Sequence, residues 1–438
     1  MSLELLHKMN GAACSCGKSH VFSAKLITGS GVLSQIPGEV RRLGGTKVFL
    51  LSDVNTWKAA GKQVYALLQE AGITCTSYSF PCEALEPDEK AVGSAIMHYD
   101  PSCDLILCTG SGVLNDIAKM LKMVTRHPYI IVGTAPSMDG YASATSSMDR
   151  DGLKVSLASA DADVILGDAE ILCNAPLKMM KAGLGDMLAK YVSICEWRIA
   201  NLITGEYYCE QVAELTRSAL KRCVDNAEKL LQRDKEAVMA VFEGLVISGI
   251  AMNYAGVSRP ASGLEHYISH CLDMRGAAFH TPTDFHGIQC AIGTLVAARL
   301  YEKVLQLQPN KEKALAHAAA FDYAAWSAQL CTLLGKGAES MIALEEKEGK
   351  YDLAKHAKRL DVILENWNSI LQIIREEMPT AAQIESILDA IDAPKTLSQI
   401  GTDDALLPVI VRATKDIRDK YVLSRLLWDL GELEDILQ

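Results

Sequence analysis

The sequence of 438 residues lacks several features that would place it in a special class of protein. It has no long basic run, and its formal net charge of −11 argues against nucleic acid or an anionic membrane surface as the main partner. The first thirty residues hold no apolar core of signal-peptide length. The most apolar later stretch, residues 240–257, is interrupted by Glu243 and Asn253, so it predicts a buried helix rather than a membrane span.

The thirteen cysteines form no pattern typical of a disulfide framework. They are scattered, and several fall inside apolar runs, which indicates reduced core thiols in a cytoplasmic protein. The exception is the segment CSCGKSH at 14–20, where Cys14, Cys16 and His20 are residue types that bind metals. Their spacing matches no common zinc pattern well, so a surface turn with two incidental thiols is the favoured interpretation.

The first 170 residues alternate short β-rich runs with helical stretches. The strands are predicted at 47–53, 74–80, 103–110 and 129–136, with helices at 55–72 and 86–100 and a hairpin-like piece around 152–168. This alternation predicts a mostly parallel sheet covered by helices.

Beyond about Pro176 the strand signals vanish and helical periodicity continues to the end of the sequence. Residues 177–202 and 380–391 are examples, the second with Thr380 placed as its N-cap. We therefore predict an α/β domain over residues 1–170, followed by an all-α domain over residues 171–438.

Two polar loops follow predicted strands. TGSGVLNDIAK (109–119) opens a helix, and its glycines allow a phosphate to approach the free N–H groups of the first helical turn. GTAPSMDGYASATSSM (133–148) lies at the carboxyl end of a strand, where open α/β sheets bind ligands. A tight turn in the first case and a solvated loop in the second remain the alternatives.

Candidate metal ligands gather in the helical half of the sequence. They are Asp186, His266, His270, His280 and His286. His266 and His270 are four residues apart, so they share one face of a helix. A catalytic zinc-type site uses three nitrogen or oxygen ligands and leaves a position open for substrate, which one aspartate and two histidines satisfy.

Five segments together resemble the bacterial type of sn-glycerol-1-phosphate dehydrogenase. They are GSGVLNDIAK, TAPSMDGYAS, GLGDMLAK, SGLEHYISH and DFHGIQ. That family belongs to the superfamily of iron-type alcohol dehydrogenases, glycerol dehydrogenase and 3-dehydroquinate synthase. The resemblance covers nearly the whole sequence, and it implies a dinucleotide-binding sheet in the first domain and a metal- and substrate-binding second domain.

The resemblance also implies an activity and a set of site residues. The activity is reversible, metal-dependent and NAD(P)H-linked reduction of dihydroxyacetone phosphate to sn-glycerol 1-phosphate. The catalytic metal ligands would be Asp186, His266 and His286, and Asp139 and His270 would face the substrate beside Asp186. Dinucleotide contacts would come from Asp53, Gly110, Ser111, Gly112, Val113, Leu114, Asn115, Asp116, Thr134, Ala135, Pro136, Ser137 and Ser143.

The expected cofactors are NAD(H), with NADP(H) as a second candidate, and one divalent metal per chain, with zinc or nickel ahead of iron. The expected partner is a small phosphorylated three-carbon substrate, with no nucleic acid or membrane, in a homodimer. Asp53 is open to two interpretations, since a carboxylate after a strand either accepts from the adenosine ribose or caps the helix that follows.

Three other functions remain as alternatives. A glycerol or simple alcohol dehydrogenase would use the same scaffold. A 3-dehydroquinate synthase-like cyclase is expected to carry a glutamate ligand and several basic residues, against which Asp186 and the sparse lysines and arginines argue. An inactive metal-binding protein is disfavoured by the intact ligand set.

Overall fold

The computed structural model describes residues 2–150 and 153–438 and divides the chain into two compact units. Unit 1 comprises Met1–Met187 and Glu214–Gly256, and unit 2 comprises Leu188–Ala213 and Val257–Gln438. The units and the predicted domains divide the chain differently, because residues 171–187 and 214–256 pack with the sheet.

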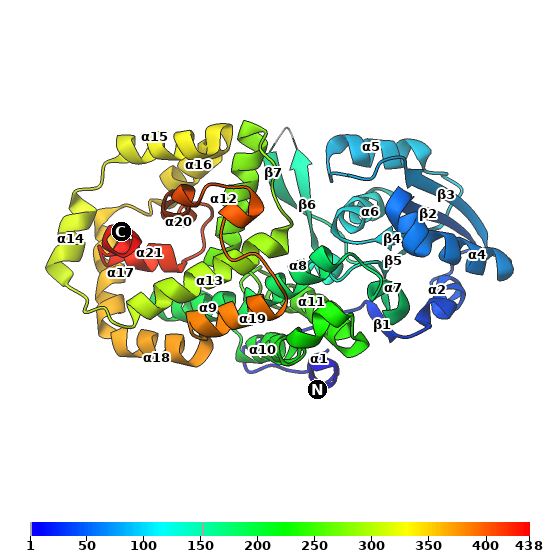
Figure 1. Cartoon of the computed structure of the whole chain (residues 1–438), viewed down its shortest axis with the longest axis horizontal. Helices are drawn as coiled ribbons and strands as arrows, with labels where there is room; N and C mark the ends of the chain where they lie inside the picture. The colour runs from blue at the N-terminus through cyan, green and yellow to red at the C-terminus, as the bar shows by residue number, and fades with distance from the viewer. Residues whose placement is uncertain (1, 151–152) are drawn as a thin grey trace. The chain divides into compact units, whose positions relative to one another are not determined.

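Unit 1 is built on a parallel sheet of six strands in the order β1-β8-β5-β4-β2-β3. The strands are β1 (Lys25–Gly29), β2 (Lys47–Asp53), β3 (Thr74–Phe80), β4 (Leu105–Gly110), β5 (Tyr129–Gly133) and β8 (Val164–Asp168). Figure 1 shows the strands in blue to cyan, whereas the described chain from green to red is helical. The predicted fold class, a mostly parallel α/β part followed by an all-helical part, is confirmed.

The central strands are buried on both faces, which is why they read as nearly continuous apolar runs. One face packs into a core with the helices that follow β1 and β2, and its members alternate along each strand. These helices are η1 (Val32–Gln35), α2 (Ile36–Arg42) and α4 (Lys62–Glu70). Helix α6 (Gly112–Thr125) contacts β2, β4 and β5, and α5 (Glu89–His98) packs against α6.

Two predicted helices differ in detail from the observed ones. The helix predicted at 55–72 is composed of α3 (Val54–Thr56), a π-helical turn (Trp57–Gly61) and α4. The helix predicted at 86–100 begins one residue after Asp88, whose side chain accepts a hydrogen bond from the Ala91 amide as an N-cap.

The hairpin expected at 152–168 is wrong in its pairing. Strand β6 (Thr145–Arg150) pairs antiparallel with β7 (Leu153–Ala158), whereas residues 164–168 form β8 of the parallel sheet. The hairpin therefore begins inside the segment predicted to be a loop, and residue 152 of the prediction lies outside the described residues. In that sheet β8 lies between β1 and β5. Both neighbours are distant in the sequence, so local sequence patterns do not specify these pairings.

Helix α11 (Lys235–Ala255) includes most of the most apolar stretch of the sequence, and it is a core helix. Among the described residues it is the one helix long and apolar enough to cross a membrane. However, 89% of the 18-residue stretch that meets this test is buried inside the protein. Its Phe242 ring packs against Gly133 of β5 and Gly167 of β8, where an added Cβ would lie 2.6 Å and 2.2 Å from ring atoms.

Helices fill the rest of the described chain. Those that matter for the site are α8 (Leu177–Leu188), α9 (Lys190–Thr204), α12 (Leu264–Phe279) and α13 (His286–Val304). The predicted helix 177–202 is split at Ala189 into α8 and α9. Helix α19 (Ala381–Ala390) confirms its prediction, because Thr380 and Gln383 form a reciprocal capping box.

Candidate active site

The sheet of unit 1 reverses its direction of growth between β2 and β4. From β2 the chain adds β3 on one side and then returns to add β4 on the other. The crevice outside the carboxyl ends of such a strand pair is where open α/β sheets bind ligands. The register that pairs Leu51 with Cys108 puts Asp53 and Gly110 at the same level, two residues further along. Both were predicted to contact a dinucleotide.

Asp53 acts as an N-cap in this structure. Its Oδ1 accepts hydrogen bonds from the amides of Asn55 (2.8 Å) and Thr56 (2.7 Å), while its own amide donates to Thr56 Oγ1 (2.9 Å). The capping interpretation is thus observed. The ribose role stays a prediction, and it is compatible with the cap because Oδ2 takes no part in these bonds.

The glycine loop leaves the first turn of α6 open. Ser111 occupies the N-cap position, but its side chain makes no capping hydrogen bond, so the first amides of this 14-residue helix are not satisfied by a cap. An anion placed there would meet free N–H groups and the positive end of the helix dipole. Gly110 is required by its surroundings, since an added Cβ would lie 2.5 Å from the Cβ of Leu114.

The side chains of Asn115 and Asp116 turn into unit 1. The Asn115 amide donates to the Gly140 carbonyl (3.0 Å) and accepts from the Tyr129 hydroxyl (2.9 Å). Asp116 accepts from the Ser147 amide (3.1 Å), and burial raises its pKa to about 6. These two side chains fasten α6 to the neighbouring loop and hairpin. The structure shows these hydrogen bonds within unit 1, and the contacts of both residues with a cofactor stay predictions.

Lys119, which the sequence analysis did not single out, organises the loop at 133–148. Its ammonium group is fully buried and donates to the Gly140 carbonyl (2.5 Å), the Ser143 hydroxyl (3.2 Å) and the Thr145 carbonyl (3.1 Å). Ser143 in turn donates to the carbonyls it shares with Lys119. Lys119 is the eighth residue of α6, inside an apolar stretch. A lysine in such a place was the one sequence signal for this role.

Two glycines let helices press against the same loop. A Cβ on Gly183 of α8 would lie 1.9 Å from the Pro136 carbonyl oxygen, and a Cβ on Gly249 of α11 would lie 2.9 Å from that of Asp139. Thr134, Ala135, Pro136 and Ser137 are buried at this contact. The loop is therefore a packed element and not the solvated segment that was its alternative.

Asp139 and Asp186 are joined through the backbone. The Asp139 amide donates to Asp186 Oδ2 (3.0 Å), and the Ser248 hydroxyl donates to Asp139 Oδ2 (2.8 Å). Asp186 is fully buried, whereas Asp139 is partly exposed. Unit 1 thus places the predicted ligand next to the residue predicted to face the substrate.

Unit 2 brings three of the predicted histidines together. The ring of His266 lies 4.9 Å from that of His286, and His270 lies 6.5 Å from His266 and 6.1 Å from His286, centroid to centroid. His266 is buried, and His270 and His286 are partly exposed. His280, the remaining candidate, ends helix α12 in a left-handed conformation and is exposed.

Hydrogen bonds fix which nitrogen each imidazole offers. His266 Nδ1 donates to Glu265 Oε1 (2.8 Å), since a carboxylate only accepts. The Ser269 hydroxyl donates its single proton to Gln289 Oε1 (2.6 Å), so it accepts from His286 Nδ1 (2.9 Å). Both rings therefore present an Nε2 lone pair, which is the arrangement that metal-binding histidines adopt. The residues fit a divalent ion.

Cys290 completes a cluster of ligand-type atoms with His266 and His286, all within 4.8 Å of one another. Its thiol lies 3.5 Å from His286 Nε2. Burial raises the pKa of Cys290, but the two imidazoles more than offset this, and its pKa is lowered overall. The sequence analysis missed this cysteine, although it lies one helical turn after His286.

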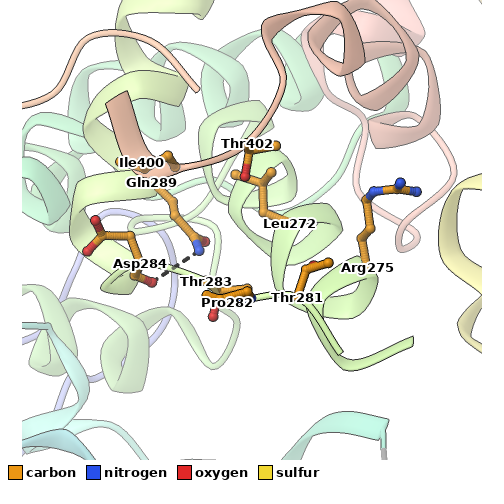
Figure 2. Close-up of a pocket in the computed structure, with 9 residues that line it drawn as sticks. All are labelled: Leu272, Arg275, Thr281, Pro282, Thr283, Asp284, Gln289, Ile400 and Thr402. Atoms are coloured by element: carbon orange, nitrogen blue, oxygen red, sulfur yellow. Dashed lines mark hydrogen bonds between the residues drawn. The ribbon is translucent and has the colours of Figure 1, made fainter. Parts of the chain in front are cut away.

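A pocket of unit 2 adjoins this network (Figure 2). Its volume is about 300 Å³, and this includes space that is open to solvent. The residues that line it are Leu272, Arg275, Thr281, Pro282, Thr283, Asp284, Gln289, Ile400 and Thr402. Gln289 donates to the Asp284 carbonyl (3.1 Å), the dashed bond of Figure 2, and to the Asp273 carboxylate (3.1 Å). These bonds orient the Gln289 amide, whose oxygen accepts the hydrogen bond from the Ser269 hydroxyl.

Arg259 is a buried basic residue of a type that could hold a substrate phosphate, but its side chain is committed elsewhere. It is 3% exposed, forms an ion pair with Glu206 through two nitrogens and donates to the Tyr421 carbonyl (2.9 Å). This geometry argues against the phosphate role. Lys420 lies nearby, donates to the Ser262 carbonyl (3.0 Å), and burial lowers its pKa to about 7.

The chain is similar in sequence to known proteins. Residues 27–176 match the model of the iron-containing alcohol dehydrogenase family. The chain is 31% identical over 298 residues to a glycerol-1-phosphate dehydrogenase (NAD(P)+) of Bacillus licheniformis, covering 67% of this chain and 74% of that protein. It is 33% identical over 280 residues to the enzyme of the same name from Methanosarcina mazei, covering 63% and 76%.

Solved structures share the fold. Glycerol dehydrogenase from Schizosaccharomyces pombe aligns with a TM-score of 0.61 at 17% identity, over 96% of this chain and 92% of that one. Maleylacetate reductase from Rhizobium sp. strain MTP-10005 aligns with a TM-score of 0.58 at 16% identity, over 94% and 96%. Its identity to these sequence relatives shows that the chain belongs to the glycerol-1-phosphate dehydrogenase family.

Proposed function

We propose that the protein catalyses the NAD(P)H-linked reduction of dihydroxyacetone phosphate to sn-glycerol 1-phosphate, and the reverse oxidation. Family membership supports the reaction class, and the names of the relatives support the substrate. The observation that carries the proposal is the pair His266 and His286, whose Nδ1 atoms are both hydrogen-bonded and whose rings both belong to one ligand cluster.

We assign the metal to these two imidazoles, with Asp186 predicted as the third ligand. A bound divalent ion supplies a Lewis acid for the ketone oxygen, on which negative charge grows as hydride reaches the carbon. Neutral imidazoles leave the ion's charge intact, and one carboxylate ligand would reduce the net charge to about +1. A net positive centre favours an anionic substrate.

His270 is proposed to hydrogen-bond the substrate rather than the metal. It lies one turn after His266 and is partly exposed, and its ring is farther from His266 and His286 than they are from each other. An imidazole that lies beside the metal ligands can donate a hydrogen bond to an oxygen of the substrate. Glu265, Ser269 and Gln289 act through the two ligating histidines, as positioning residues.

The cofactor is proposed to bind in unit 1, at the crevice between β2 and β4. Its pyrophosphate would lie against the uncapped start of α6, and its adenosine end near Asp53. The same proposal includes zinc or nickel as the metal, NAD(H) as the preferred cofactor and a homodimer as the assembly. These three parts rest on the family resemblance.

The test is NADH oxidation by metal-reconstituted protein with three substrates. Dihydroxyacetone phosphate should be preferred over dihydroxyacetone by a large factor in kcat/KM, because charge-assisted hydrogen bonds to a phosphate supply several kcal/mol. Simple aldehydes should be poor substrates. Equal kcat/KM for the phosphorylated and unphosphorylated ketone would assign the protein to glycerol oxidation on the same scaffold.

A further inference from the structure

The segment at 11–20 buries only its metal-binding residue types. Every other side chain from residue 11 to residue 19 is exposed, whereas Cys14 and Cys16 are partly buried and His20 is 2% exposed. The segment has no apolar side chain directed inward, so hydrophobic burial does not explain why these three turn to the same side.

The backbone of the segment is a small hairpin that brings the three residues together. Ala13 and Ser19 form an antiparallel bridge, and the Cys14 amide donates to the Lys18 carbonyl (3.2 Å). The turn closes with the Gly17 amide donating to the Cys14 carbonyl (3.0 Å), and Gly17 adopts a φ of 82°, which favours glycine.

The ligand atoms of Cys14, Cys16 and His20 lie within 4.8 Å of one another. Cys16 Sγ is 3.5 Å from His20 Nε2. Tetrahedral zinc with Zn–S of about 2.3 Å and Zn–N of about 2.0 Å separates a sulfur ligand from a nitrogen ligand by about 3.5 Å. The observed separation is thus the one that two ligands of a single ion would have.

The orientation of His20 agrees with a ligand role. Its Nδ1 lies 3.1 Å from the Tyr254 carbonyl oxygen, and a carbonyl only accepts, so Nδ1 carries the proton. Nε2 then carries the lone pair, and it faces the Cys16 thiol. A histidine whose other nitrogen donates to a backbone carbonyl is the usual arrangement at a protein-bound metal.

We propose that Cys14, Cys16 and His20 form a second, structural metal site that binds zinc or another thiolate-preferring divalent ion. Two thiolates and an imidazole suit zinc, and they leave one tetrahedral position for a further ligand. Its three named residues belong to unit 1, whereas the histidine pair belongs to unit 2. The alternative that this proposal has to displace is a turn with two incidental thiols.

The ion would cross-link the N-terminal hairpin, and the hydrogen bond from His20 to the Tyr254 carbonyl would connect it to helix α11. Both ends of the hairpin are already held, since Asn10 exchanges two hydrogen bonds with Phe22 (3.1 Å and 2.7 Å) and the Tyr254 hydroxyl donates to Asn10 (3.4 Å). Without a core of its own, a segment this exposed gains its order from such fastenings.

The test uses the full-length protein loaded with Co²⁺, whose thiolate ligands give an intense charge-transfer band in the near ultraviolet. We expect the wild type to show this band and to bind one tightly held zinc ion more than Cys14→Ser/Cys16→Ser, which should lose the band. His20→Ala should weaken zinc binding by at least tenfold. The band intensity counts thiolates, so a further sulfur ligand, if the chain supplies one, is detected in the same measurement.

Two control variants separate this site from other thiols. Cys82→Ser, another partly buried cysteine of unit 1, should retain the band, and so should Cys290→Ser, which removes the thiol beside the histidine pair. Absence of the band from the wild type would overturn the proposal without any variant. Its loss in Cys290→Ser together with its survival in Cys14→Ser/Cys16→Ser would place the thiolate in the helical unit instead.

Discussion

At the scale of single residues, the histidine pair illustrates how neighbours decide a side chain's chemistry. His266 and His270 look equivalent in the sequence, four residues apart on one helix. His266 has a carboxylate on its Nδ1, and His286 has a hydroxyl there that is forced to accept. The assignment of these two histidines as metal ligands rests on these bonds.

Substitution of these histidines should separate metal binding from turnover. His266→Ala is expected to lose most of its bound metal and nearly all activity while the protein stays folded, because one of the ligands is gone. His270→Ala should retain the metal and lose activity in kcat/KM. Metal content and steady-state kinetics of the two variants measure this, with His280→Asn as a control that keeps a residue tolerant of its left-handed backbone. Equal metal loss in both variants would remove the distinction.

Much of this site follows from the sequence, and part of it does not. Glu265 adjoins His266, and Cys290 follows His286 by one helical turn, so both were within reach of local patterns. Ser269 and Gln289 were not, because their role depends on how α12 packs on α13. The commitment of Arg259 to Glu206 is likewise a non-local ion pair that spacing does not reveal.

The dual role of Asp53 calls for a variant that keeps its cap. Asp53→Ala would remove the cap, at about 1 kcal/mol, together with any contact to the ribose. Asp53→Ser preserves a capping oxygen and removes the negative charge that disfavours a 2′-phosphate. We expect the ratio of kcat/KM for NADH to that for NADPH to fall severalfold in Asp53→Ser with little change in thermal stability. An unchanged ratio would leave capping as the residue's whole role.

At the scale of elements, two helices hold the loop at 133–148 in place by glycine contacts. The strands beneath it were predictable because buried parallel strands read as runs of Val, Ile and Leu. The short edge strand β1 was not predicted, and β8 was taken for half of a hairpin, since both pair with each other far along the chain. The packing of the loop against α8 and α11 was also beyond sequence patterns, because it depends on tertiary approach.

Gly183→Ala should disturb the loop more than the helix that carries it. The added Cβ would lie 1.9 Å from the Pro136 carbonyl oxygen, so backbone must move, at about 1–3 kcal/mol. We expect a raised KM for the cofactor and a lower melting temperature. Gly93→Ala is the matched control, since it lies in helix α5 with nothing within 4 Å of its added Cβ. That variant should be neutral or more stable by up to about 1 kcal/mol. Similar losses in both variants would indicate a general intolerance of alanine.

At the scale of the whole molecule, the chain passes from unit 1 to unit 2, back to unit 1 and again to unit 2. A boundary predicted from the loss of strand signals does not detect this return, because helices that cover a sheet and helices of a separate unit have the same periodicity. Each unit has its own buried polar groups, and in unit 2 these include the carboxylates Glu196 and Glu265, both almost fully buried.

Glu196 should make the stability of the folded protein depend on pH. Its carboxylate accepts from the Leu264 (3.0 Å) and Leu423 (2.8 Å) amides, but burial and then the charge of Glu265 raise its pKa to about 8, against the lowering effect of Arg259. The folded state therefore holds a proton that the unfolded chain releases near pH 4.5. Stability from this group is complete below that pH and is lost as pH rises to about 8, by roughly 5 kcal/mol at most.

Glu196→Gln removes this titration while keeping the shape of the side chain. The free energy of unfolding, measured by urea denaturation at pH 5, 6.5 and 8, should fall less steeply with pH in the variant than in the wild type. The stability of the variant relative to the wild type should accordingly be highest at pH 8, where the wild type must either hold a proton in competition with solvent or bury a second negative charge near Glu265. Glu312→Gln, an exposed change in helix α14 (Lys311–Ala319), should leave the wild-type profile intact. Parallel profiles for Glu196→Gln and the wild type would show that Glu196 is already ionised in the folded protein, with the Leu264 and Leu423 amides and Arg259 sufficient to hold its charge.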